Sequence, residues 1–367
     1  MRLTRIAARG FRNLVTLDLE LPAEGAVFLG HNGQGKTNLL EAISYPVLFR
    51  SIRRARDAEL VRTGETSFHL CLTVQSAGAG ADRTVEAGYA NEGQRKRVAV
   101  DRVDCPTVTD GLGAWLAVVF QPTDLSLVAG GAGERRQYLD RVLSLADRSY
   151  FSALRRYRAA LEQRNAAFRR RRPELARPFE PALASAGAEL IRRRIDWIAE
   201  LAPHWVAACA DLGEPMPVSL VYRSRSELTD PEAWPAALAE ARPRDEARAT
   251  TTIGPHRDDL GLFLDGLPLR SRGSTGQLRT AAVALKLCER ETLVRRTGLE
   301  PALLLDDVFA ELDRNRQDRL ARMLGIGGPA QIFVTTPRAD ELPPGLGLPV
   351  FAIRNGTVLR ENGRAVA

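Results

Sequence analysis

The sequence predicts an α/β fold in which a mixed sheet is split along the chain by an inserted, mainly helical lobe. Segments in the first and last thirds alternate apolar and polar residues as strands do, whereas the stretch from Glu134 to about Asp211 has the apolar spacing of long helices. We therefore divide the chain into residues 1–121 and 250–367, which together form a sheet-bearing domain, and residues 122–249, which form the inserted lobe.

The N-terminal part is expected to consist mainly of strands. Leucines alternate with polar residues over 17–21, and the apolar run 26–29 leads into a glycine-rich turn and a helical pattern that begins at Thr37. Over 67–100, alternating segments are separated by turn-forming clusters such as AGAGAD at 77–82, which indicates antiparallel hairpins.

The inserted part is expected to be helical. Prolines at 173, 178 and 181 interrupt the helical spacing of 134–211, which favours two long helices in an antiparallel pair. A short strand over 218–222 and a further helix over 229–248 are expected to follow.

The C-terminal part returns to alternating helices and strands. A helix is expected over 278–296, followed by the apolar strands of PALLLDD (301–307) and QIFVTTP (331–337). A hairpin over 350–362 follows, in which Asn355-Gly356 is a strong signal for a tight turn.

Residues 30–37, Gly-His-Asn-Gly-Gln-Gly-Lys-Thr, match the phosphate-binding loop and lie between a predicted strand and a predicted helix. In such loops the glycines let backbone N–H groups surround the phosphates, a lysine (here Lys36) neutralises the β- and γ-phosphate oxygens, and a hydroxyl (here Thr37) binds Mg²⁺. Lysine is informative here because the chain contains only Lys36, Lys96 and Lys286. A glycine-rich turn matched by accident is the alternative, and the position of the motif favours nucleotide binding.

A phosphate loop needs a carboxylate to hold the metal ion, and such a group commonly ends a buried parallel strand. Asp306, after the apolar run 303–305, is predicted to bind Mg²⁺ through water, and Asp307 to orient and deprotonate the attacking water as the catalytic base. Alone, the pair fits an acidic helix cap equally well. The phosphate loop favours the metal site.

Ser274-Thr275-Gly276-Gln277 lies directly before a predicted helix. A hydroxyl and a glycine N–H at a helix start can bind an anion, although an ordinary N-cap is the alternative. The position of the segment, one helix before the acidic strand, favours the anion site.

The net charge of +7 favours polyanionic partners, namely nucleic acid, nucleotide or an anionic membrane surface. The longest apolar runs fall far short of the roughly 18 residues of a membrane-spanning helix, and no secretory signal is visible, so we expect a cytoplasmic protein without a membrane span. The four cysteines and four histidines are scattered, and their spacing indicates neither a metal site nor a Cys/His catalytic pair.

The order of phosphate loop, Ser-x-Gly-Gln segment and acidic strand resembles that of ABC-type ATPase heads, and 311–313 (Glu-Leu-Asp) is similar to their D-loop. In that superfamily the signature segment of one head covers the ATP bound to another. The resemblance therefore implies an ATP-dependent homodimer.

Blocks spread over the whole chain resemble the RecF family of bacterial recombinational-repair ATPases, and they lie at 9–13, 32–42, 134–140, 163–166, 254–259 and 304–313. The resemblance implies a cytoplasmic, ATP-dependent clamp that acts in DNA replication and repair. Such a clamp binds DNA at gaps and double-strand/single-strand junctions and, with the partner proteins RecR and RecO, helps to load the RecA recombinase.

The resemblance also implies the residues that contact ATP: Arg12, Asn13, Gly30, His31, Asn32, Gly33, Gln34, Gly35, Lys36, Thr37, Asn38, Gln121, Ser274, Gly276 and Gln277. It assigns Mg²⁺ to Thr37, Gln121 (the Q-loop residue) and Asp306.

Two departures from most ABC-type heads imply slow hydrolysis. Asp307 stands where most heads carry glutamate, and Thr335 and Thr336 occupy the place of a switch histidine. We expect a weak, DNA-stimulated ATPase that acts as a switch. His256, in the block 254–259, fits either a turn held by its neighbours or a nucleotide-sensing role.

Residues 155–194 contain twelve arginines and only four acidic residues. Spaced arginines on helices fit contacts to DNA phosphates. The run 169–172, next to the proline-rich break, also fits a solvated turn.

Two other classes of protein compete with a DNA-binding switch. The nucleotide-binding subunit of an ABC transporter is disfavoured by the long insertion between Gln121 and Ser274 and by the missing switch histidine. A structural head of the SMC or Rad50 kind would need a long coiled coil that this chain lacks.

Overall fold

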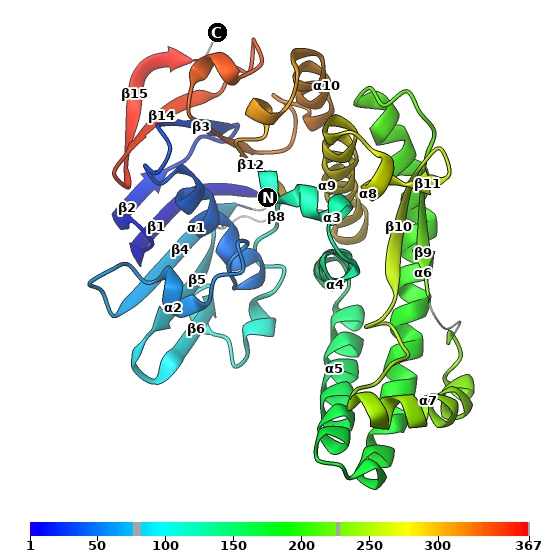
Figure 1. Ribbon diagram of the computed structural model, residues 1–367. Helices are drawn as coiled ribbons and strands as arrows, with labels where there is room; N and C mark the ends of the chain where they lie inside the picture. The colour runs from blue at the N-terminus through cyan, green and yellow to red at the C-terminus, as the bar shows by residue number, and fades with distance from the viewer. Residues whose placement is uncertain (76–81, 225–227, 366–367) are drawn as a thin grey trace. The chain divides into compact units, whose positions relative to one another are not determined.

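The structure is a computed structural model that describes residues 1–75, 82–224 and 228–365, so most of the AGAGAD cluster lies outside the described residues. The chain divides into two compact units (Figure 1). Unit 1 comprises Met1–Thr123 and Glu289–Ala367, and unit 2 comprises Asp124–Cys288.

Unit 2 extends past the lobe boundary expected at residue 249. It does so because β10 (Asp259–Leu264) pairs antiparallel with β9 (Val218–Arg223) and therefore belongs to the sheet of the inserted unit. The Ser274 segment consequently lies in unit 2 and the phosphate loop in unit 1.

Unit 1 contains two six-stranded sheets. The first is antiparallel throughout, as the hairpin signals predict, with the order β2 (Leu14–Glu20), β1 (Arg2–Phe11), β4 (Ser67–Gln75), β5 (Arg83–Ala90), β6 (Arg95–Val100) and β7 (Val103–Asp104).

The second sheet is mixed, as expected. Its order is β15 (Thr357–Ala365), β14 (Pro349–Arg354), β3 (Gly25–Leu29), β13 (Ile332–Thr336), β12 (Ala302–Asp306) and β8 (Ala117–Phe120), and only the β14–β15 pairing is antiparallel. Strands β3, β8, β12 and β13 are almost wholly buried, which explains why their sequences are continuous apolar runs rather than alternating ones.

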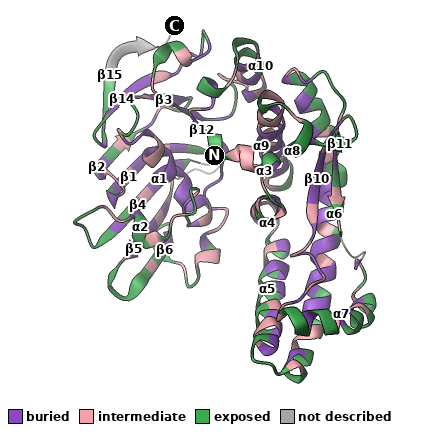
Figure 2. Cartoon of the chain, in the orientation of Figure 1, coloured by how far each residue is buried: buried purple, intermediate pink, exposed green. Residues whose placement is uncertain are grey.

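Helix α1 (Lys36–Leu48) contacts strands of both sheets of unit 1. Every residue over 39–47 is buried (Figure 2). Such a helix needs apolar residues on all sides, so it lacks the one-sided pattern of a surface helix. The remaining short helices described in unit 1 are α2 (Asp57–Leu60), η1 (Glu92–Gln94), η2 (Val108–Gly111), η6 (Phe309–Glu311), α10 (Arg314–Leu324) and η7 (Ala339–Glu341), and η3 (Pro122–Asp124) spans the boundary with unit 2.

Unit 2 is built on the predicted antiparallel pair of long helices, α5 (Arg148–Arg169) and α6 (Glu180–Asp211), joined by the 3-10 helix η4 (Pro173–Phe179). Pro181 lies in the first turn of α6, where a missing N–H costs nothing. The sheet β9-β10-β11 (Leu267–Pro268) packs on α6 through β9.

The other helices of unit 2 are α3 (Leu125–Ala129), α4 (Ala132–Ala146), η5 (Pro231–Ala233), α7 (Trp234–Arg248), α8 (Leu269–Arg272) and the first part of α9 (Thr275–Thr297). Over the described part of the chain, no helix combines the length and the apolar character needed to cross a membrane.

Candidate nucleotide-binding site

The carboxyl ends of four neighbouring parallel strands meet at one edge of the mixed sheet in unit 1. The phosphate loop follows β3, Asp306 ends β12, and Thr336 ends β13. The register pairs Phe120 with Leu305, which places Gln121 beside Asp306 in the next position. Residues far apart in the sequence thus meet where α/β sheets commonly bind ligands.

The phosphate loop is tightly packed against its neighbours. Gly35 caps α1 with φ 114°, and a Cβ atom there would lie 2.8 Å from the side-chain amide of Asn13. Lys36 is buried, and its Nζ donates hydrogen bonds to the carbonyl oxygens of Gly30 (2.8 Å) and His31 (3.4 Å). The ammonium group therefore lies over the loop, where phosphate oxygens bind in proteins with this motif.

Two other segments hold the loop through Gln34. Its carbonyl oxygen accepts hydrogen bonds from the Asn13 side chain (3.2 Å) and from the N–H of Gly356 (2.8 Å). Its Oε1 accepts one from the N–H of Asn355 (2.7 Å), and Asn38 donates to Asn13 at 2.9 Å. Asn355 and Gly356 both have positive φ (47° and 76°), so the predicted hairpin turn also braces the loop.

Arg12 lies in the turn before β2 and is bound to α1. Its Nε and Nη2 donate to the fully buried carboxylate of Glu41 at 2.9 and 3.2 Å, and its Nη1 donates to the Glu59 carbonyl oxygen at 3.2 Å. The Ser51 hydroxyl also donates to Glu41. Glu41 was not predicted from the sequence, although an acid within a mainly apolar helical segment could have indicated a buried, paired charge.

Asp306 meets two hydroxyl groups. Its Oδ1 accepts hydrogen bonds from Thr37 (2.9 Å) and Thr335 (2.8 Å). Burial raises the pKa of Asp306, and the two hydroxyls partly oppose this shift. A hydroxyl and a carboxylate at the end of a phosphate loop are oxygen ligands that suit Mg²⁺.

Asp307 adopts a left-handed backbone conformation (φ 50°) that is uncommon outside glycine. Its N–H donates to Thr335 Oγ1 at 3.0 Å. Burial, and then the neighbouring Asp306, raise the pKa of Asp307, which favours a carboxyl group able to take up a proton. Thr335 thus links the two acids, at one of the two positions where the sequence has threonine in place of a switch histidine.

We predict that Asp306→Asn raises the melting temperature of the nucleotide-free protein by a few degrees. Because the pKa of Asp306 is raised, its ionised form costs stability above the usual pKa of aspartate, and this cost disappears as the pH falls or when the amide replaces the acid. The same change should weaken ATP binding at least about tenfold in Mg²⁺ and little in EDTA. Calorimetric binding and melting curves measure both, and a lower melting temperature or an unchanged Mg²⁺ dependence would contradict this prediction.

The Ser274 segment forms a capping box at the start of α9. Ser274 Oγ accepts the N–H of Gln277 (3.3 Å), and Gln277 Oε1 accepts the N–H of Ser274 (2.8 Å). The N-cap alternative is therefore realised in the structure. It does not exclude anion binding, because Ser274 is exposed and its hydroxyl proton is not used in this pair.

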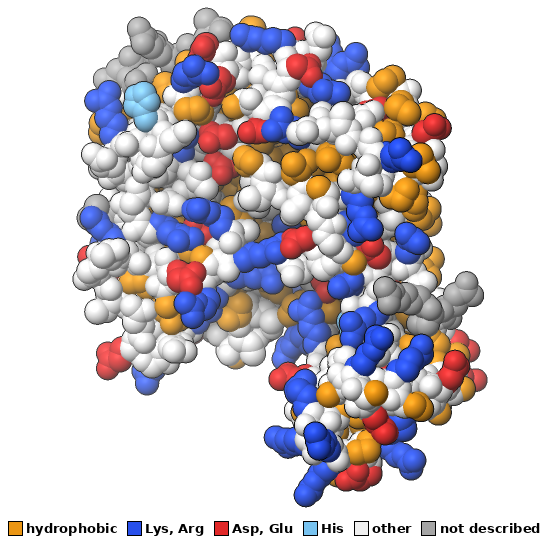
Figure 3. All heavy atoms as spheres, viewed as in Figure 1, with side chains coloured by type: hydrophobic (Ala, Val, Ile, Leu, Met, Phe, Trp, Pro, Cys, Tyr) orange, Lys and Arg blue, Asp and Glu red, His pale blue; other side chains and the backbone are white. Residues whose placement is uncertain are grey.

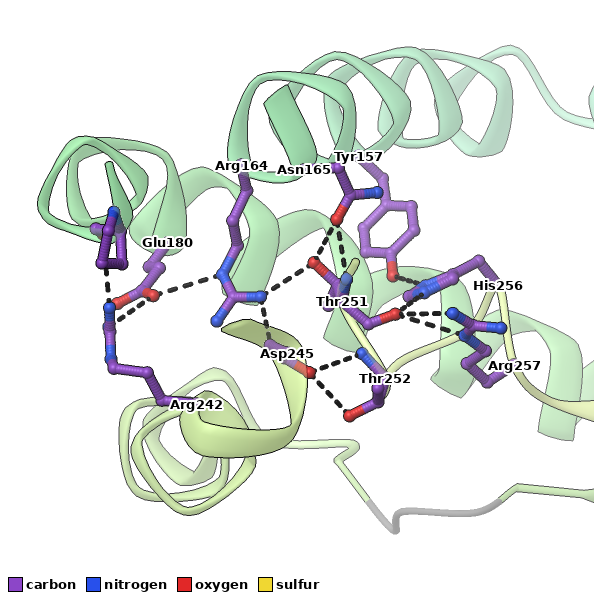
Figure 4. Close-up of polar contacts among 11 residues, drawn as sticks. Tyr157, Arg164, Asn165, Glu180, Arg242, Asp245, Thr251, Thr252, His256 and Arg257 are labelled. Atoms are coloured by element: carbon purple, nitrogen blue, oxygen red, sulfur yellow. Dashed lines mark hydrogen bonds and ion pairs between the residues drawn. The ribbon is translucent and has the colours of Figure 1, made fainter. Parts of the chain in front are cut away.

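The blocks 163–166 and 254–259 meet inside unit 2, where they hold elements together (Figure 4). Arg164 is fully buried and donates to Asp245 (2.7 Å), to the hydroxyl of Thr251 (2.8 Å) and to Glu180 (3.2 Å). Asn165 accepts two hydrogen bonds from Thr251. Arg164 is one of the twelve arginines over 155–194 whose spacing fits DNA contacts, and its burial excludes it from that set.

Arg194 is excluded in the same way. It is buried and donates to Asp140 (2.7 Å), Tyr150 (3.0 Å) and the Pro255 carbonyl oxygen (2.7 Å). Both buried arginines pair with acids that lie far along the sequence, so no local pattern distinguishes them from their exposed neighbours.

His256 fits the turn alternative. Its Nε2 lies 2.9 Å from the Thr251 carbonyl oxygen and must carry the proton, so its Nδ1 accepts the Tyr157 hydroxyl at 2.6 Å (Figure 4). Burial lowers the pKa of His256 to about 4. The ring is therefore neutral near pH 7, with both nitrogens used inside unit 2.

A phosphate loop and two adjacent acids at the carboxyl edge of a mixed sheet, together with an inserted unit that carries the Ser-x-Gly-Gln helix start, define an ABC-type ATPase head. The comparisons with known proteins agree. Curated DNA replication and repair proteins RecF from Anaeromyxobacter sp. and Heliobacterium modesticaldum are 38% and 37% identical to this chain, and each alignment covers at least 95% of both sequences. The chain belongs to the RecF family of DNA replication and repair proteins.

Solved structures give the same result. The recombination mediator protein RecF of the RecFOR pathway, described as RecF-ATP, superimposes with a TM-score of 0.90 at 31% identity, covering 98% of this chain and 97% of that one. The Smc head domain of Pyrococcus furiosus shares the fold alone, with a TM-score of 0.57 at 16% identity. No family model matches the chain.

Proposed function

We propose that this protein is an ATP-dependent, DNA-binding switch of recombinational repair. The observation that carries the proposal is that Lys36, Thr37 and Asp306 lie together at one edge of the mixed sheet. A relative of this chain, the recombination mediator protein RecF, is described with ATP. A transporter subunit would not be expected in a family of DNA replication and repair proteins.

ATP is proposed to bind over 30–37, with its phosphates against the loop N–H groups and Lys36. Thr37, Asp306 and Gln121 would hold Mg²⁺, which would neutralise charge on the phosphates. Asp307, at the same edge of the sheet, would accept the proton of the attacking water. A short carboxylate and threonines in place of a switch histidine support slow hydrolysis, as in a switch rather than a motor.

A homodimer is proposed because the two halves of an ABC-type site lie in different units of the chain. The phosphate loop belongs to unit 1 and the Ser274 segment to unit 2. In ABC-type heads the second segment covers the nucleotide of another copy, so two copies would enclose two ATP molecules by two-fold symmetry. ATP that binds the dimer more tightly must strengthen dimerisation to the same extent.

DNA is the proposed polyanionic partner, at gaps and double-strand/single-strand junctions, with RecR and RecO as protein partners. Exposed arginines cover the end of the α5–α6 hairpin, where Figure 3 shows blue side chains gathered. Arg169–Arg172 are all exposed, and no ion pair joins them to an acid within the described part of unit 2. Their charge is therefore available to phosphate groups.

We predict that serine at Arg169–Arg172 weakens binding to gapped duplex DNA. Loss of up to four phosphate contacts should flatten the slope of log K against log salt by up to about 3.6 and lower DNA stimulation of ATP hydrolysis. Fluorescence anisotropy over a salt series measures the slope. Serine at exposed Arg95 and Arg97 of unit 1 is the control. An unaltered slope would identify 169–172 as a solvated turn, and no DNA stimulation of the unmodified protein would contradict the proposed function.

A further inference from the structure

The backbone conformation at the C-terminal end of α6 fixes the position of one acidic residue, Glu214. Gly213, with φ 95°, donates its N–H to Ala210, and Glu214 donates its N–H to Cys209. These two hydrogen bonds form the glycine-dependent Schellman motif that ends many helices. The backbone of Glu214 is therefore fixed by the helix end rather than by a free loop.

The side chain of Glu214 reaches the start of α9. Its Oε1 accepts a hydrogen bond from Gln277 Nε2 (3.2 Å) and from the N–H of Met216 (3.1 Å). Gln277 in turn forms the reciprocal pair with Ser274. One side chain, Gln277, thus connects the end of α6 to the hydroxyl-bearing segment.

If Glu214 served only as a structural contact, its burial would lower the stability of the folded protein. The residue is 7% exposed, and its Oε2 has no hydrogen-bond partner among the described residues. A buried carboxylate oxygen without a partner lowers stability, so the contact with Gln277 is made at a cost to the folded protein. The arrangement therefore points to a task beyond packing.

We propose that Glu214 is a positioning residue that holds Gln277, and through it Ser274, in the geometry that receives the nucleotide of a second copy. Because Ser274 Oγ accepts the Gln277 N–H, its own proton is directed elsewhere and can be donated to a phosphate oxygen. Without Glu214, the Gln277 amide loses its oxygen acceptor and keeps, among the described residues, a contact with Met216 Sδ (3.7 Å) beside its pair with Ser274, so the rotamer that supports the capping pair is less firmly fixed. This inference rests on the proposed ATP-dependent homodimer.

The test compares Glu214→Ala, which removes the acceptor, with Glu214→Gln, which keeps an acceptor of the same size. In sedimentation with ATP and Mg²⁺, the alanine variant should need at least about tenfold more protein to form the dimer, whereas the glutamine variant should match or exceed the unmodified protein. ATP affinity of the dilute monomer should be equal in all three, because the phosphate loop is untouched.

Hydrogen exchange without nucleotide provides a readout that does not depend on the dimer. The amides in the first turn of α9 should exchange faster in Glu214→Ala than in Glu214→Gln or the unmodified protein. A folded alanine variant with unchanged dimerisation, or a glutamine variant as weak as alanine, would overturn the inference. If the unmodified protein forms no dimer with ATP, the proposed homodimer fails and the inference with it, whatever the exchange rates show.

Discussion

Lys36→Ala is expected to weaken ATP binding at least about 100-fold, to the limit of calorimetric detection. Lys36 is the buried cation of the loop, and its Nζ donates to the loop carbonyls of Gly30 and His31 in the absence of nucleotide. An alanine would leave the β- and γ-phosphate charges without a direct counter-charge in a partly dry site. Isothermal titration with ATP and Mg²⁺ measures the loss.

Lys36→Arg is the matched control for charge. A guanidinium keeps the positive charge but spreads it over a plane, so this variant should still bind ATP while turning over poorly. Melting curves without nucleotide should differ little among the three proteins, because the described hydrogen bonds of Lys36 Nζ are to two carbonyl oxygens of its own loop. Unchanged ATP affinity in Lys36→Ala would show that ATP does not bind at the phosphate loop.

Removal of Asp245, a buried acid of unit 2, should have the largest effect on stability. Asp245 is fully buried and accepts hydrogen bonds from Arg164 (2.7 Å) and from both the N–H and the hydroxyl of Thr252 (Figure 4). Asp245→Ala would leave the Arg164 charge buried, with Glu180 as its one remaining acidic partner among the described residues. We expect a cost of about 3–5 kcal/mol.

The double variant Arg164→Leu/Asp245→Ala should lose less stability than Asp245→Ala alone, because it removes the uncompensated charge as well as its partner. Trp197, Trp205 and Trp234 lie in unit 2 and only Trp115 in unit 1, so tryptophan fluorescence during urea unfolding reports mainly on unit 2. A double variant as unstable as the sum of the two single variants would show that the pair is not coupled.

Local sequence signals predicted most of the unit 1 elements that form the candidate nucleotide-binding site. The strand before the phosphate loop, α1, the acidic end of β12 and the Asn355-Gly356 turn each depend on residues adjacent in sequence. Their meeting at one edge also follows from the sequence, because carboxyl ends of parallel strands share an edge. The bracing of Gln34 by Asn13 and Gly356 does not, since it depends on segments far apart in the chain.

Unit 2 was harder to predict for the same reason. The two long helices and their proline-rich connection were expected from spacing, whereas the pairing of β9 with β10, which brings residues beyond 249 into unit 2, was not. Arg164 and Arg194 have the same local sequence character as the exposed arginines around them. Arg164 and Arg194 form buried ion pairs with Asp245 and Asp140, which lie far along the chain, so the pairs become visible only in the folded structure.

Sedimentation of the unmodified protein with and without ATP and Mg²⁺ tests the central claim most directly. The claim is that ATP held by Lys36 in unit 1 of one copy completes its site with the Ser274 segment of another. It predicts a mass that doubles on addition of ATP, with no change for Lys36→Ala under the same conditions. A mass that is the same with and without ATP over micromolar concentrations would contradict the account.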